Sequence, residues 1–115
     1  MRQATLPVAR QLLASPKASI AELWVRPFED DAAAHDDDLQ AQLDRDFVTA
    51  FQEAQSELSE ELGRPARFGQ EHDEAVPLSG VFRFAIWSVG DQNLWLAAAH
   101  EDRECPFVLL LGTGS

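Results

Sequence analysis

The sequence is poor in several residue types, and each shortage excludes a class of protein. Its 115 residues include one cysteine, Cys105, and no tyrosine. A lone cysteine excludes an intramolecular disulfide and a disulfide-stabilised secreted scaffold. No apolar run approaches the ~20 residues of a membrane span, and the N-terminal residues lack the apolar segment of a signal peptide. We therefore expect a single domain, residues 1–115, located in the cytoplasm.

Basic residues are also scarce. Nine Lys and Arg face 20 Asp and Glu, which gives a formal net charge of -11. Nucleic acids and anionic membranes are themselves polyanions, so this charge argues against binding to either. Few basic residues and no tyrosine also leave no stacking platform for single-stranded nucleic acid. The partner that such a surface favours is a basic protein.

The negative charge is concentrated in one segment. Residues 29–61 hold 12 acidic residues and one basic residue, Arg45, whereas the remainder holds eight of each and is neutral. An acidic surface by itself serves solubility. Its confinement to one segment favours a surface that meets a partner.

Most of this segment is predicted to be one long helix, from about Asp38 to Leu62. Asp36, Asp37 and Asp38 provide an N-cap and negative charge at the positive end of the helix dipole. Gly63 is suited to a helix C-terminus. Apolar residues recur at steps of three and four along a single stripe: Leu39, Leu43, Phe47, Ala50, Phe51, Ala54, Leu58 and Leu62.

Four acidic residues, Asp46, Glu53, Glu57 and Glu60, line one flank of this stripe. No Lys or Arg lies four residues beyond any of them, so pairs within the helix do not neutralise this row. The row therefore faces solvent, or it meets basic groups from elsewhere in the fold or from another molecule.

The rest of the chain predicts a short N-terminal helix and a small sheet. The helix spans residues 5–14, with Thr5 as N-cap, and residues 29–38 form a loop or an extra helical turn. Short connections join the last three strands, which therefore form an antiparallel meander that ends at Gly112. Strands are expected at 81–89, 94–99 and 107–111. Residues 22–26 favour a strand, with a helical turn as the alternative, and residues 66–68 could form a short edge strand. The predicted fold is α+β, with three or four antiparallel strands against the long helix.

No set of residues predicts catalysis, a metal site or a cofactor. His35, His72 and His100 all have acidic neighbours, but their spacing matches no metal motif. Solvated loop histidines are the favoured interpretation. Cys105 follows Glu104, and nearby carboxylates oppose the thiolate that a nucleophile needs. The glycines form no phosphate-binding loop.

Trp87 and Trp95 flank the first predicted hairpin turn. Tryptophan is common both in cores and at interfaces, so core packing and a docking face both remain open. The residues that the sequence offers for partner binding are Asp37, Asp38, Asp46, Glu53, Glu57, Glu60, Trp87 and Trp95.

These features predict a small acidic binding module, monomeric or homodimeric. The specific hypothesis is a bacterial immunity or inhibitor protein that occludes the active site of a basic toxin, such as a nuclease. The first alternative is a chaperone or adaptor for a secreted protein or an assembly, which an exposed aromatic sheet face would favour. The second is a small enzyme or metal-binding domain that uses the histidine-containing acidic loops.

Overall fold

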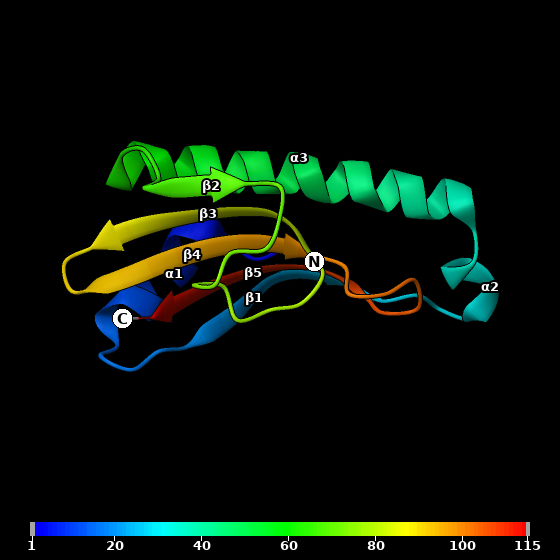
Figure 1. Ribbon diagram of the computed structural model, residues 1–115, viewed down its shortest axis with the longest axis horizontal. Coiled ribbons are helices and arrows are strands. Elements are labelled where there is room, and N and C mark those ends of the chain that lie inside the picture. Colours follow the sequence, from blue (N-terminus) through cyan, green and yellow to red (C-terminus); the bar gives the residue numbers. More distant parts are fainter. Residues whose placement is uncertain (1, 115) are drawn as a thin grey trace.

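The computed structural model describes residues 2–114 and confirms an α+β fold (Figure 1). Two helices, α1 and α3, accompany one sheet, and a short helix, α2, precedes α3. The helices are α1 Thr5–Ala14, α2 Asp31–Ala34 and α3 Asp37–Leu62. The strands are β1 Ile20–Arg26, β2 Arg67–Gly69, β3 Val81–Val89, β4 Gln92–Ala99 and β5 Phe107–Gly114.

The sheet has five antiparallel strands in the order β1-β5-β4-β3-β2. Strands β3, β4 and β5 pair in sequence as the predicted meander. The prediction of three or four strands is nevertheless too small, because β1 joins the edge of β5 and β2 joins the edge of β3. The pairing of Ile20 with Gly112 connects opposite ends of the chain, and no local pattern encodes it.

Helix α3 begins and ends where its sequence supplies caps. The Asp36 carboxylate accepts hydrogen bonds from the backbone N–H groups of Asp38 and Leu39, at 3.0 and 3.1 Å. At the other end Gly63 has φ of 83° and donates its N–H to the Ser59 carbonyl at 2.9 Å. Both ends lie within one residue of the prediction.

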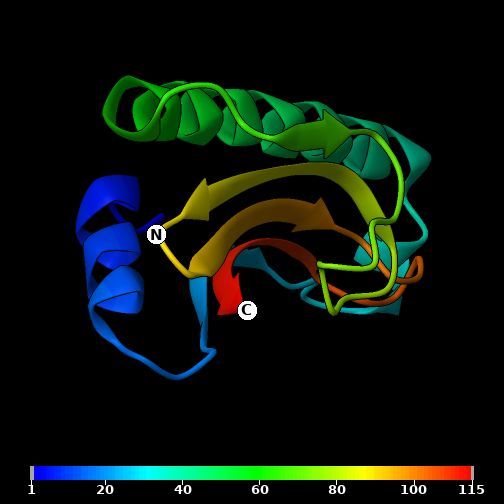
Figure 2. The same ribbon diagram turned by 60° about the vertical axis from the view of Figure 1, so that its left-hand side comes forward.

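Helices α1 and α3 pack next to each other against one face of the sheet (Figure 2). Phe47 of α3 is completely buried at the centre of this core. Its ring stacks on Trp24 of β1 with centroids 4.0 Å apart and lies 5.4 Å from the Phe107 ring of β5. One helical side chain thus joins the first and last strands of the chain.

The other face of the sheet is covered by the segment 70–80, which we call the strap. Val76 at its centre is fully buried against a second apolar cluster that includes Trp95 and Leu110. The Arg67 guanidinium holds Asp73 through two hydrogen bonds of 3.1 and 2.9 Å. Both sheet faces are therefore covered by parts of the same chain.

Strand β5 continues through Gly112 to Gly114, so the prediction that Gly112 ends this strand is wrong. The Trp95 ring of β4 lies directly over Gly112, where a Cβ atom would overlap the indole. Glycine is thus required at this position because of packing, not because the chain turns.

Three smaller predictions also change. The N-cap of α1 is Ala4 rather than Thr5, and no side chain caps this helix end. Strands β1 and β4 each begin two residues earlier than expected. Part of the uncertain 29–38 stretch forms α2, whose N-cap Asp30 accepts a 2.8 Å bond from the Ala33 N–H.

Candidate protein-binding interface

The acidic flank of α3 faces the N-terminal segment over part of its length. The Arg2 guanidinium pairs with Glu53 at 2.9 Å, and Arg10 of α1 pairs with the neighbouring Glu61 at 3.3 Å. These pairs are largely exposed and each contributes little stability. Their placement nevertheless gives the row basic neighbours from elsewhere in the fold, one of the alternatives that the sequence left open.

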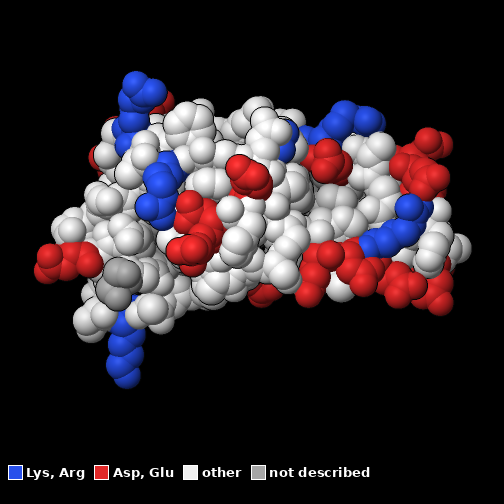
Figure 3. All heavy atoms as spheres, viewed as in Figure 1, with Lys and Arg blue, Asp and Glu red and all other residues white. Residues whose placement is uncertain are grey.

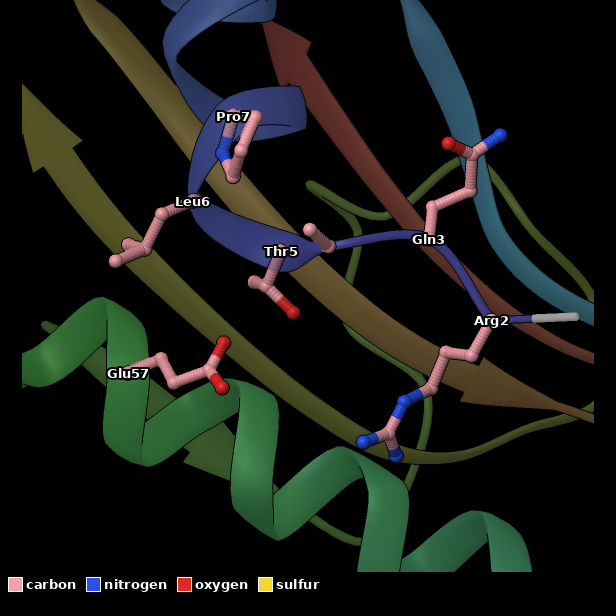
Figure 4. Close-up of a pocket in the computed structure, with 7 residues that line it drawn as sticks. Arg2, Gln3, Thr5, Leu6, Pro7 and Glu57 are labelled. Atoms are coloured by element: carbon pink, nitrogen blue, oxygen red, sulfur yellow. The ribbon is translucent and has the colours of Figure 1, made fainter.

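Glu57 lies between those two ion pairs, beside a shallow hollow of about 480 Å³ (Figure 4). Figure 4 shows its side chain extending from α3 toward the first turn of α1, where Thr5 and Leu6 lie. No side chain caps that helix start. A carboxylate near the positive end of a helix dipole is favourable, so this position suits Glu57, whose side chain is exposed.

The members of the flank row differ in their surroundings. Asp46 is half-buried and accepts a 2.8 Å hydrogen bond from the Gln42 amide, while Glu60 is exposed. The row therefore does not form one uniform open surface. Its central residues, Glu53 and Glu57, lie beside the N-terminal segment.

The two tryptophans predicted as partner contacts are core residues. Trp87 and Trp95 are each 1% exposed. The Trp87 indole N–H donates to the Gly63 carbonyl at 2.9 Å and so fixes the end of α3 to the sheet. This burial removes both indoles from the candidate surface and leaves core packing as their role.

A different set of acidic residues gathers at one end of the molecule, where α2 and the start of α3 meet the loop after β4. We define the acidic end as residues 29–38 and 100–106. It contains nine acidic residues and one basic residue, Arg103, and thus carries -8 of the total charge of -11. Figure 3 shows acidic side chains gathered at the right-hand end of the molecule, where Figure 1 places α2 and the start of α3. The acidic residues are Glu29, Asp30, Asp31, Asp36, Asp37, Asp38, Glu101, Asp102 and Glu104.

Polar contacts hold the two segments of the acidic end together. The Gln40 amide donates to the Ala34 carbonyl and to the Arg103 carbonyl, at 2.9 Å each. The Arg103 guanidinium binds the Asp37 carboxylate, and His35 Nε2 lies 3.8 Å from Glu104. Hydrogen bonding to Arg103 lowers the pKa of Asp37 below its ordinary value of 3.8.

Some of these carboxylates accept hydrogen bonds that stabilise the local fold, and others do not. Asp30 and Asp36 are N-caps, so their position follows from helix formation. Asp102 accepts the backbone N–H of Glu104 at 3.1 Å within its own loop. In contrast, Glu29, Asp38 and Glu101 are exposed and their carboxylates take no part in the hydrogen bonds described above. Their charge is therefore exposed to solvent.

The histidines and the cysteine do not assemble into a reactive site. Within residues 2–114, no group of three or more His, Cys, Asp or Glu side chains is placed to hold a metal ion. Burial is the main cause that raises the pKa of the Cys105 thiol, and the carboxylates of Asp102, Glu101 and Glu104 act in the same direction. This environment favours the neutral thiol over the nucleophilic thiolate.

Comparison with known proteins gives no relative: the chain matches no protein-family model, no curated protein and no solved structure. Among the residues that the structure describes, no helix combines the length and the apolar character needed to cross a membrane. The candidate surface is therefore defined by its own geometry and charge.

Of the predicted site residues, the structure places Asp37 and Asp38 in the acidic end. Sequence reasoning missed the contribution of the 100–106 loop, which is 66 positions from Asp37 at the Arg103 contact. A signal was present, because Glu101, Asp102 and Glu104 interrupt two apolar strands with a dense group of carboxylates. What the sequence does not encode locally is that this turn lies beside the start of α3.

Proposed function

We propose that this protein is an electrostatically steered binding module whose acidic end docks on a basic surface of a partner protein. The observation that carries the proposal is the location of -8 of the -11 charges on 17 residues at one end of the molecule. Charge complementarity of this kind accelerates encounter and selects the orientation of approach.

The specific form of the proposal is an immunity or inhibitor protein that neutralises a basic toxin in the bacterial cytoplasm. A nuclease active site is built to attract phosphate, so a rigid group of carboxylates is suited to occupy it. The capped start of α3 and the pinned 100–106 loop hold several carboxylates in place before binding, which lowers the entropy cost of association.

The alternative function, a chaperone or adaptor, would be favoured by a broad exposed aromatic face on the sheet. Among residues 2–114, the large apolar side chains that are mainly exposed are Ile20 at 52% and Phe68 at 60%. They belong to β1 and β2, at opposite edges of the sheet. This distribution supports a binding surface based on charge rather than on apolar area.

Charge reversal at the acidic end tests the proposal. The triple variant Glu29→Lys, Asp38→Lys and Glu101→Lys removes carboxylates that cap neither helix. With the partner recovered from extracts of the source cells and then purified, we expect calorimetry to show binding at least about tenfold weaker, since close opposite charges contribute strongly to such interfaces.

The matched control is the triple variant Glu60→Lys, Glu71→Lys and Glu74→Lys, at exposed positions outside the acidic end. It changes the net charge by the same amount, and we expect less than about a threefold loss of affinity. Circular dichroism verifies that both variants are folded. Equal losses in the two variants would show that only overall charge matters, and an unaffected acidic-end variant would refute the proposed surface.

A further inference from the structure

His100 follows the last residue of β4 and is the first residue of the 100–106 loop. Its imidazole stacks on the Phe107 ring with centroids 3.8 Å apart and planes at 14°. The Phe28 ring lies 6.2 Å away in a tilted arrangement. The prediction of a solvated loop histidine is therefore wrong for His100, which packs as part of an aromatic cluster, whereas His35 and His72 are exposed.

The Nε2 atom of His100 is buried and has no hydrogen-bond partner among residues 2–114. A neutral imidazole occupies such a position at moderate cost, because it carries no charge. A protonated ring has an N–H at both nitrogens. It would place a positively charged donor in this site without an acceptor, which is far more costly.

Two carboxylates and two backbone groups act against this effect of burial. Asp102 of the same loop and Asp44 of α3 favour the protonated ring, as do backbone groups of Cys105 and Arg103. The neighbouring rings of Phe28 and Phe107 bear no charge. Burial outweighs these influences, and the pKa of His100 lies below its ordinary value of 6.5.

The position of His100 matters because backbone contacts fix the loop at this residue. The His100 N–H donates to the carbonyl of Gly80 in the strap at 2.9 Å, and the Cys105 N–H donates to the Asp102 carbonyl at 3.0 Å. Gly80 has φ of 72° and lies against the backbone of Glu101. A displaced His100 ring would therefore disturb the strap contact and the turn together.

We propose that His100 is a pH sensor whose protonation expels the ring from its site against Phe107 and releases the 100–106 loop from its fixed position. Two exposed contacts remain, the Arg103–Asp37 ion pair and the bond from the Gln40 amide to the Arg103 carbonyl. Neither is expected to hold the whole loop, because exposed ion pairs and hydrogen bonds contribute little net stability. In weakly acidic solution the acidic end would thus lose its ordered second segment. This inference concerns the isolated chain and does not depend on the proposed function.

The direction of the pH effect follows from the lowered pKa. Above the ordinary histidine value the ring is neutral in both folded and unfolded chains, so the closed loop has its full stability. As the pH falls below 6.5, the unfolded or released state binds the proton first, and stability is lost until the lowered pKa is passed. The pKa of Asp37 is below 3.8, so Asp37 stays ionised throughout this window.

Amide hydrogen exchange of the isolated protein, followed by NMR at about pH 7.5 and about pH 5 and corrected for intrinsic rates, tests the sensor. The reporters are the amides of His100 and Cys105. We expect their protection to fall by at least about threefold at the lower pH, while amides in the middle of α3 keep theirs. Unchanged protection at both reporters would overturn the proposal.

Variants identify the group that titrates. His100→Phe keeps the stacked ring without a titratable nitrogen, and His100→Gln is a second non-titrating variant should the first fail to fold. In either one, we expect the protection of Cys105 to be the same at both pH values. The controls His35→Gln and His72→Gln should retain the wild-type fall. The proposal would be overturned if the protection of Cys105 still fell at the lower pH in the His100 variants. It would also be overturned if that fall disappeared in the His35 variant, because the titrating group would then lie elsewhere.

Discussion

Replacing Phe47 by Ala is expected to lower the free energy of unfolding by about 3–5 kcal/mol, the range for deleting a buried aromatic ring. Phe47 is completely buried. Its ring stacks on Trp24 and contacts the Phe107 ring, so truncation opens a cavity where helix α3 meets the first and last strands. Because small domains have only about 5–15 kcal/mol of stability, this one change removes a large part of the total.

Urea denaturation followed by fluorescence and circular dichroism measures this loss. Phe68→Ala is the matched control, because it deletes the same side chain at a position that is 60% exposed. We expect the control to cost less than about 1 kcal/mol. Similar losses for the two variants would contradict the arrangement of α3 over the sheet.

Gly112→Ala is expected to cost about 3 kcal/mol or more, at the upper end for overpacking a filled core. The added Cβ would overlap the buried indole of Trp95, with the indole nitrogen 2.8 Å away and ring carbons nearer still. The strand backbone and a fully enclosed ring give little room for relief. The same substitution at Gly114 in the same strand meets nothing within 4 Å and should be almost neutral.

A double-mutant cycle tests the cause of this loss. Trp95→Phe shortens the ring that opposes Gly112 and by itself leaves a cavity. Combined with Gly112→Ala, it should cost less than the sum of the single changes by at least about 1 kcal/mol, because the two residues share one volume. Additive losses in denaturant titrations would mean that the indole is not the obstacle.

The sequence predicts those elements whose signals are local. Helix α3 is found almost to the residue, because its apolar period lies within the element and its caps, Asp36 and Gly63, are the residues directly next to it. The pairing of β1 with β5 is not found, because it depends on the packing of residues more than 80 positions apart, such as Ile20 and Gly112. Gly112 itself is misread as a stop, because a glycine that accommodates a distant ring has the same local signature as one that ends a strand.

The candidate surface likewise has a part that local sequence predicts and a part that depends on distant contacts. Asp37 and Asp38 follow from local sequence, and the structure places them at the acidic end. The role of the α3 flank is decided by Arg2 and Arg10, each 51 positions from its partner. Charge patterns identify which side chains lack neighbours within a helix, but only the fold brings Arg2 beside Glu53 and Arg10 beside Glu61.

The partial burial of His100 is also beyond local reasoning. Three acidic residues within its turn suggest a solvated loop, and the turn is indeed exposed at Glu101, Asp102 and Arg103. The His100 ring packs instead against Phe107 and Phe28, which approach it from β5 and from the segment that follows β1. A single residue at the base of a polar loop can therefore pack against core side chains.

The association rate measured against ionic strength tests the central claim, that the acidic end steers a basic partner into place. Between about 20 and about 300 mM salt, we predict that the rate constant falls by at least about tenfold while the dissociation rate changes little. The acidic-end triple variant should have a lower association rate constant at low salt and should lose most of the salt dependence. The matched control should keep most of that dependence. An association rate that is independent of salt in the wild-type protein would contradict the account.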